Sequence, residues 1–129
     1  MNASARPTII LFAHGARDRA WAGTLKELRG RIAANAPEAE VVTAFLEFQA
    51  PTFADVFAAA AQAGSRSVIV VPVFWASGGH VANELPGLME SARRAHPEVA
   101  VRILPALSEL PGLLDFVAGA VTRLARDEP

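Results

Sequence analysis

Two kinds of hydrophobic pattern alternate along this chain. Four short runs are continuous in apolar residues and rich in β-branched ones, which is typical of strands buried on both faces. Between them, apolar residues recur every three or four positions, as on one face of a helix. We therefore expect strands over Pro7–Ala13, Glu40–Glu47, Ser67–Trp75 and Val99–Pro105, and helices over Arg19–Asn35, Phe53–Ala63, Val81–His96 and Glu109–Ala125.

Strand and helix alternate four times, which favours an α/β fold with a parallel sheet. Right-handed crossovers restrict the topology of such a sheet to a few doubly wound orders. We expect four parallel strands in the order 2-1-3-4, with helices on both faces. No linker or low-complexity run divides the chain, so we expect a single domain over residues 1–129, with its core over about 7–125.

The composition narrows the function classes. The chain has 129 residues and a formal net charge of −1, so no basic surface calls for nucleic acid. It contains no cysteine, which excludes disulfides, thiolate metal sites and cysteine nucleophiles. No apolar run reaches the roughly 18 residues of a membrane span, and the first residues do not resemble a signal peptide. We expect a cytoplasmic protein with no membrane partner.

Three chemically capable residues share one position in this pattern. His14 follows the first predicted strand, Glu47 ends the second, and His80 lies a few residues beyond the third. Thirty-three residues separate His14 from Glu47, and again Glu47 from His80, which is about one strand–helix–strand unit. Parallel strands would place all three at the carboxyl edge of the sheet, where open α/β sheets bind their ligands.

Two imidazoles and a carboxylate form a mixed nitrogen and oxygen set for a first-row divalent metal ion. The same groups also serve as proton acceptors near neutral pH. Each residue alone has a simpler interpretation, since a histidine after a strand often makes only a hydrogen bond and a glutamate there is usually solvated. The third histidine, His96, fits the end of a helix before Pro97.

The residues around His80 add possible ligand contacts. Ser77, Gly78 and Gly79 lead into a helix N-terminus, where glycine permits close backbone approach and free N–H groups favour anions. Arg17 is a candidate partner for an anionic ligand. Phe74 and Trp75 line an apolar pocket or cap the core, and strand alternation requires only one of them to face inward.

Three segments together resemble a known family. "LFAHGARD", "AFLEFQAPTFADV" and "VIVVPVFWASGGHVANELPGLM", in this order and spacing, are similar to the small CbiX family. These are short sirohydrochlorin chelatases of the class II tetrapyrrole chelatase superfamily. The resemblance runs from about Ile9 to Leu104. The family's usual serine after His-Gly is Ala16 here, and its frequent aspartate after the second histidine is Glu84.

The resemblance implies insertion of a divalent metal into sirohydrochlorin, cobalt toward cobalamin or iron toward siroheme. By ligand chemistry alone, Ni²⁺ also accepts histidine and glutamate ligands. His14 and His80 match the family's metal-binding and proton-accepting histidines, and Glu47 matches the acidic residue of its second block. The transferred metal is a substrate, and no organic cofactor is required. Longer relatives join two similar halves and this chain matches one, so we expect a homodimer with its tetrapyrrole site between the subunits.

Two alternatives stay open at the level of sequence. A non-catalytic metal or tetrapyrrole carrier of the same fold would use the same groups as a chelatase. A histidine-dependent phosphoryl-transfer enzyme is suggested by "LFAHG", which resembles the "RHG" of phosphoglycerate mutase-like enzymes. Ala13, however, stands where their arginine would be.

Overall fold

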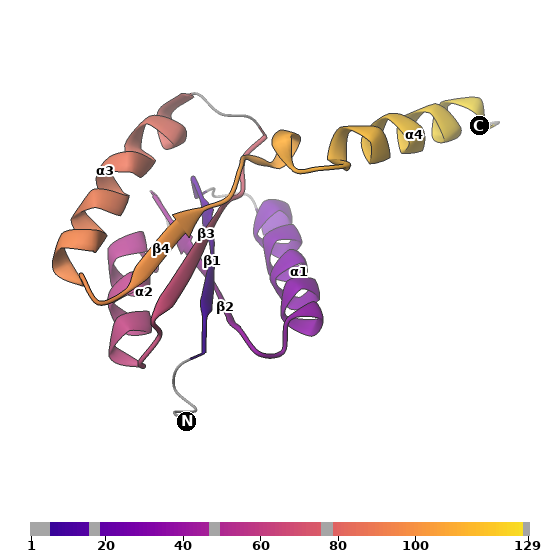
Figure 1. Ribbon diagram of the computed structural model, residues 1–129. Helices are drawn as coiled ribbons and strands as arrows, with labels where there is room; N and C mark the ends of the chain where they lie inside the picture. Colours follow the sequence, from indigo (N-terminus) through magenta and orange to yellow (C-terminus); the bar gives the residue numbers. More distant parts are fainter. Residues whose placement is uncertain (1–5, 16–18, 47–49, 76–78, 128–129) are drawn as a thin grey trace.

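A four-stranded parallel sheet in the order β2-β1-β3-β4 forms the centre of the computed structural model (Figure 1). The structure describes residues 6–15, 19–46, 50–75 and 79–127. The predicted fold class and strand order are confirmed. The elements are, in chain order, β1 (Thr8–Ala13), α1 (Arg19–Asn35), β2 (Glu40–Phe45), α2 (Phe53–Gln62), β3 (Ser67–Pro72), α3 (Gly79–Ala95), β4 (Ala100–Ile103), the 3₁₀ turn η1 (Leu107–Glu109) and α4 (Leu113–Arg126).

The predicted start of the last helix is wrong. A single helix from Glu109 was expected, but that residue ends the turn η1 and α4 begins only at Leu113. Leu110, which precedes a proline, is extended with φ −67° and ψ 135°, as proline's steric clash with the preceding residue favours. Gly112 then takes φ +87°, a conformation that glycine adopts without strain. The Pro-Gly pair therefore separates the turn from the helix.

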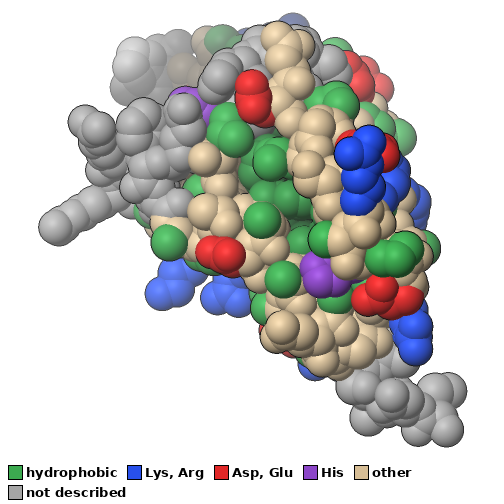
Figure 2. Space-filling model, turned by 90° about the vertical axis from the view of Figure 1, so that its left-hand side faces the viewer, with side chains coloured by type: hydrophobic (Ala, Val, Ile, Leu, Met, Phe, Trp, Pro, Cys, Tyr) green, Lys and Arg blue, Asp and Glu red, His purple; other side chains and the backbone are tan. Residues whose placement is uncertain are grey.

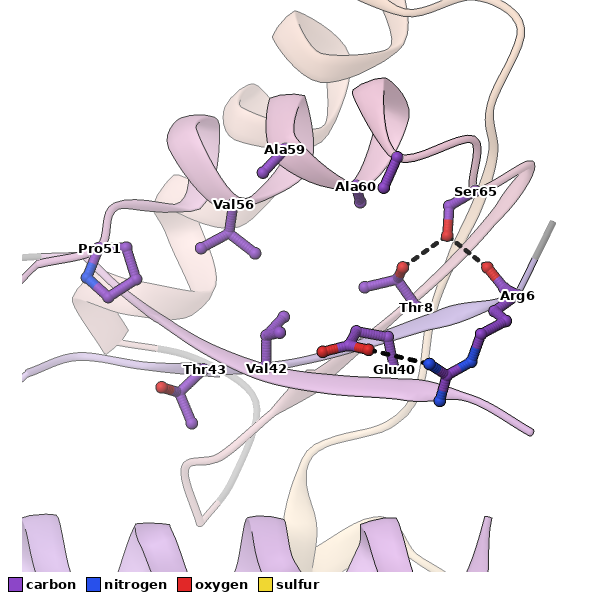
Figure 3. Close-up of a pocket in the computed structure, with 11 residues that line it drawn as sticks. Arg6, Thr8, Glu40, Val42, Thr43, Pro51, Val56, Ala59, Ala60 and Ser65 are labelled. Atoms are coloured by element: carbon purple, nitrogen blue, oxygen red, sulfur yellow. Dashed lines mark hydrogen bonds and ion pairs between the residues drawn. The ribbon is translucent and has the colours of Figure 1, made fainter. Parts of the chain in front are cut away.

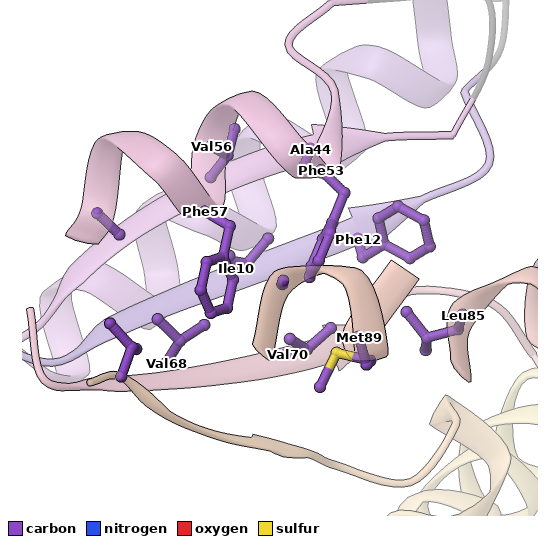
Figure 4. Packing of buried hydrophobic residues seen from close by; sticks show 13 residues of the cluster. Ile10, Phe12, Ala44, Phe53, Val56, Phe57, Val68, Val70, Leu85 and Met89 are labelled. Carbon is purple, nitrogen blue, oxygen red and sulfur yellow. The ribbon is translucent and has the colours of Figure 1, made fainter. Parts of the chain in front are cut away.

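The helices α2 and α3 cover one face of the sheet (Figure 1). In Figure 4 their side chains meet those of β1 and β3, with Phe12 and Phe53 packed edge to face at a centroid distance of 5.5 Å. Met89 of α3 is also fully buried here. Figure 2 shows this side of the molecule, with a central strip of hydrophobic side chains and charged side chains around it.

The other face is covered less completely. The helix α1 lies over it and buries Leu25 against β1 and β2, with Trp21 and Ile32 partly buried beside it. At the opposite edge, three of the four residues of β4 are exposed and Val101 is half-buried. The helix α4 projects away from the sheet and has no buried residue (Figure 1).

Candidate functional site

The strands β1, β2 and β3 end together at one edge of the sheet. Phe45 pairs with Ala13 at the end of the β1–β2 register. Beyond it, Leu46 N–H donates to the Ala13 carbonyl at 3.0 Å, and Val73 N–H donates to the Phe12 carbonyl at 2.8 Å. These bonds hold the backbone on both sides of β1 up to the point where it leaves the sheet. That point is the carboxyl edge predicted to bind a ligand.

His14 is the first residue past β1, an inner strand, and its side chain is half-buried. The next residue, Gly15, is buried and has φ +98°. A side chain at this position would be strained in that conformation, so the glycine allows the chain to turn directly after the histidine. The His-Gly pair thus places His14 at the carboxyl edge of the sheet, directly after an inner strand, which is the position expected from the sequence.

Phe74 and Trp75 follow β3, the strand next to β1, and their side chains have different surroundings. Phe74 is half-buried and packs on the core under α2 and α3, whereas Trp75 is 55% exposed. Only one aromatic residue faces inward, as expected, but both lie in a bend beyond the end of β3, so strand alternation is not the cause. The exposed indole provides apolar surface next to the edge that holds His14.

The helix α3 begins at Gly79, two residues earlier than expected, so His80 lies in its first turn. The backbone of His80 therefore follows β3, the strand beside β1, and the N-terminal end of α3 faces the same edge. The side chain of His80 lies outside the part of the chain that the structure describes.

Several predicted site residues fall outside the described residues. Glu47, Arg17, Ser77 and Gly78 all do so. Among the residues that are described, no group of three histidine, cysteine or carboxylate side chains is placed to hold a metal ion. The structure therefore places His14 directly after β1 and the backbone of His80 in the first turn of α3, which follows the neighbouring strand β3, and leaves the complete ligand set as a prediction.

The third histidine lies at the other end of α3. His96 N–H donates to the Ala92 carbonyl at 2.9 Å, its ring centroid is 5.7 Å from that of Phe57, and its Nδ1 is 3.9 Å from Glu98 Oε2. A histidine that ends the helix and packs on the core matches the structural role expected from the sequence.

A cavity of about 450 Å³ lies between β2 and α2, along the sheet edge (Figure 3). Its polar end is built by Arg6, whose guanidinium is 3.3 Å from a Glu40 carboxylate oxygen. Beside them, the buried Ser65 hydroxyl donates to the Arg6 carbonyl and accepts from the Thr8 hydroxyl at 2.6 Å. Thr8 and Glu40 open their strands, so this polar end lies opposite the His14 edge. No motif in the sequence indicated this cavity.

None of the helices in the described ranges is both long and apolar enough to cross a membrane.

Two solved structures have a similar fold. A CbiX protein from Marinobacter aquaeolei VT8 has a TM-score of 0.78 and 26% identity, over 94% of this chain and 99% of that chain. The sirohydrochlorin chelatase SirB from Bacillus subtilis subspecies spizizenii, solved in complex with cobalt, also has a TM-score of 0.78. Its identity is 19%, over 93% of this chain but only 51% of the SirB chain.

Curated relatives point the same way by sequence. A protein from Methanococcoides burtonii is 29% identical over 82 residues, and one from Methanococcus maripaludis is 30% identical over 81 residues. Both are named sirohydrochlorin cobaltochelatase. The matches cover 64% and 63% of this chain and 63% and 56% of the relatives, so the chain spans less than two thirds of their length. The CbiX family profile matches residues 8–124. The chain belongs to the CbiX family.

Proposed function

We propose that this chain inserts a divalent metal ion, with cobalt as the first candidate, into sirohydrochlorin. The observation that carries the proposal is His14, which directly follows an inner strand at the ligand-binding edge of a CbiX-family sheet. Support for the substrates comes from the relatives named sirohydrochlorin cobaltochelatase and from the cobalt complex of SirB.

The reaction requires groups that remove protons and groups that hold a metal ion. Two pyrrole N–H protons must leave the macrocycle as the ion enters its centre. We assign His14 and His80 as proton acceptors and metal ligands, because a neutral imidazole performs both roles near neutral pH. Glu47 is the third proposed ligand, and its carboxylate would offset part of the charge of the incoming ion.

We assign substrate recognition to segments of the same chain that lie next to these three residues. Sirohydrochlorin is an apolar disc with eight carboxylates at its rim. The exposed Trp75 indole offers a surface for the disc, with Phe74 supporting it from the core side. The N-terminal end of α3, the segment Ser77–Gly79 before it and Arg17 are the proposed partners of the carboxylates.

The proposal also covers which metal is inserted and which pathway uses the product. Imidazole and carboxylate ligands accept Co²⁺, Fe²⁺ and Ni²⁺, and the affinity order follows the metal more than the site. Cobalt would lead toward cobalamin and iron toward siroheme. Cobalt is placed first because both the curated relatives and the SirB complex name it.

We also place the tetrapyrrole site between two copies of the chain. A sheet edge of one small domain walls only one side of a disc that is roughly 15 Å across, whereas pockets usually bury most of such a ligand. About half of the SirB chain is matched by this one, which leaves room there for a second unit of similar length. A homodimer would supply the same second wall here.

The test is an anaerobic metallation assay on sirohydrochlorin, followed by absorbance, with Co²⁺, Fe²⁺ and Ni²⁺ in parallel. His14→Ala and His80→Ala should each lower turnover by at least about 100-fold, the usual contribution of a general base. His96→Ala is the matched control and should retain turnover, because His96 lies at the far end of α3. Circular dichroism and a thermal melt check that each variant is folded.

Two results would overturn the proposal. Wild-type protein that binds metal and tetrapyrrole without turning them over would be a carrier. Near wild-type turnover in either edge-histidine variant would remove that residue from the mechanism. Glu47→Gln should raise the metal concentration needed for half-maximal rate more than it weakens tetrapyrrole binding, and equal effects on both would argue against a metal-ligand role.

A further inference from the structure

The strand β2 forms one edge of the sheet, and its outer side has no neighbouring strand among the described residues. Glu40 N–H donates to the Pro7 carbonyl at 2.9 Å, which shows that the backbone of Glu40 faces β1. Because the backbone groups of successive strand residues point to opposite sides, those of Val41 and Thr43 point away from β1. Their N–H and C=O groups therefore lie along an edge that a further strand would use.

The open part of this edge is short and regular. It ends at Phe45, whose N–H points the same way and donates to the Pro51 carbonyl at 2.9 Å. Every residue of β2 pairs in register with β1, so no bulge twists the edge away. Val41, Val42 and Thr43 are β-branched, which favours the extended backbone. The strand thus carries neither a proline nor a bulge, two of the features that usually block the addition of a further strand.

A cavity lies on each side of the open edge. The larger one, of about 450 Å³, lies between β2 and α2, with Val42 facing Val56 and Ala60 across it (Figure 3). The smaller one, of about 230 Å³, lies between β2 and α1. Thr43 lines both cavities, and Figure 3 shows its side chain pointing away from that of Val42. Since successive side chains of a strand point to opposite faces, a strand added to this edge would direct them alternately into the two cavities.

The two cavities differ in chemistry. The larger one is walled mainly by aliphatic side chains, and its two charged residues, Arg6 and Glu40, are paired with each other at 3.3 Å. The smaller one has two cations in its wall, Lys26 and Arg29 of α1, and no described residue of that wall is acidic. An aliphatic side chain therefore suits the cavity beside α2, whereas a carboxylate suits the cavity beside α1.

We propose that the β2 edge binds an extended segment of another protein in which aliphatic and acidic residues alternate. The segment pairs its backbone with Val41 and Thr43, places aliphatic side chains beside α2, and places acidic ones beside Lys26 and Arg29. In strand addition of this kind, main-chain hydrogen bonds provide affinity and the pockets for alternate side chains provide specificity. The site is separate from the chelatase edge, so the proposal does not depend on the proposed function.

A second copy of this chain is a poorer occupant of the same edge. Two β2 strands paired about a twofold axis would bring the α1 sides of both copies together. Lys26 and Arg29 of one copy would then face their own equivalents, and β2 offers only the uncharged Val41 and Thr43 on that side. Like charges placed opposite one another destabilise a strand pair. The charge of the smaller cavity therefore favours a different chain with acidic residues.

The first experiment titrates the peptide Ac-Val-Glu-Val-Glu-Val-NH₂ into the isotope-labelled protein and follows amide hydrogen exchange by NMR. Exchange at Val41 and Thr43 should slow by roughly tenfold or more at saturation, while Val42 and Ala44, which already bond to β1, should change little. The peptide Ac-Val-Val-Glu-Glu-Val-NH₂ is the control, because it has the same composition without the alternation. No binding at millimolar peptide, equal binding of both peptides, or protection only outside β2 would each overturn the proposal.

The second experiment tests the cationic cavity with a matched pair of charge reversals on α1. Arg29→Glu should weaken binding of the glutamate peptide about fivefold and favour the lysine peptide Ac-Val-Lys-Val-Lys-Val-NH₂, because an attraction becomes a repulsion. Arg31→Glu makes the same change in net charge on the exposed side of the helix, where Arg31 pairs with Glu27. It should change binding less than about twofold. Equal weakening by both variants would assign the effect to overall charge and overturn the proposal.

The third experiment removes one backbone donor from the edge. Thr43→Pro deletes the outward N–H and leaves the hydrogen bonds between β1 and β2 in place, because proline is tolerated on an edge strand where its nitrogen faces outward. Peptide binding should weaken at least about tenfold. Thr43→Val keeps the N–H and the β-branched shape, so it should bind as the wild type does. Circular dichroism checks both folds, and if Thr43→Pro does not fold, the comparison of Arg29→Glu with Arg31→Glu decides. A folded Thr43→Pro protein with wild-type affinity overturns the proposal.

Discussion

The helices α3 and α4 each follow a strand and each have one apolar side, yet α3 packs on the sheet and α4 is exposed. The helix α3 turns back over the sheet and buries Leu85, Met89 and Ala92. The helix α4 turns outward after β4 and buries no residue. The difference lies in their connections, because η1 and the Pro111–Gly112 pair separate α4 from its strand.

This contrast separates two properties that amphipathicity is often taken to imply together. An apolar stripe shows that one side of a helix must be covered. It does not show which chain provides the cover. The apolar side of α3 stabilises its own domain, whereas the apolar side of α4 is available to another molecule. Substitutions on the two helices should therefore affect different equilibria.

The largest difference is expected between Met89→Ala on α3 and Leu124→Ala on α4. Met89 is 1% exposed, so its truncation leaves a cavity and should lower the free energy of unfolding by roughly 2–5 kcal/mol at any protein concentration. Leu124 is 66% exposed and should leave the unfolding of the monomer nearly unchanged, while it weakens pairing. Urea denaturation at several protein concentrations measures both effects.

This comparison fails if Leu124→Ala destabilises a dilute, monomeric sample as much as Met89→Ala does. That result would mean that α4 packs on its own sheet in solution. A concentration-independent midpoint for the wild-type protein would contradict pairing through α4 in the same experiment.

A smaller effect is expected at Gly112, in the connection between η1 and α4. Gly112→Ala forces a side chain into φ +87° at a cost of about 1 kcal/mol, although no atom within 4 Å would meet the added Cβ. Because the strain is present in the folded chain whether or not it pairs, the free energy of unfolding should fall by about the same amount, which urea denaturation measures. Gly119→Ala is the matched control, since this helical glycine also has open space around it. Alanine there should be neutral or slightly stabilising. Equal loss of stability in both variants would rule out strain as the cause.

The smallest effect is expected on the outer surface of α3. Arg94 Nε lies 3.4 Å from Glu90 Oε2, and the two side chains are 80% and 57% exposed. Exposed pairs of this kind contribute little because water and salt screen them. A double-mutant cycle with Arg94→Ala and Glu90→Ala should give a coupling below about 0.5 kcal/mol. A coupling near that of a buried contact would show that surface charge, and not the buried side, holds α3 in place.

The sequence predicted the bounds of helices and strands closely where those bounds depend on neighbouring residues alone. The bounds of α1 were predicted to the residue, and β1 differs only in that it starts at Thr8 and not Pro7. His14 was placed correctly because the residue after a buried inner strand must emerge at the sheet's carboxyl edge. The early end of β3 at Pro72 was not foreseen, because the apolar run continues to Trp75 after the sheet pairing has stopped.

What remained beyond prediction depends on contacts between distant segments. The cavity beside α2 requires Arg6, Glu40 and Ser65 to meet, and they come from three separate parts of the chain. The outward course of α4 depends on two hydrogen bonds to the segment after β3, which no periodicity encodes. The roles of Glu47, Arg17, Ser77 and Gly78 lie outside the described residues and stay predictions.

The turn η1, which precedes α4, has a practical consequence for engineering this protein. The two hydrogen bonds from Leu107 and Ser108 fasten the helix to Phe74 and Trp75, which lead toward the start of α3. A surface tether fused after Arg126 and placed under force would load these bonds and transmit its pull to Trp75. The other terminus enters β1 from the opposite end of the sheet (Figure 1). Fusions are therefore best made at the N-terminus, where the attachment is mechanically isolated from the candidate site.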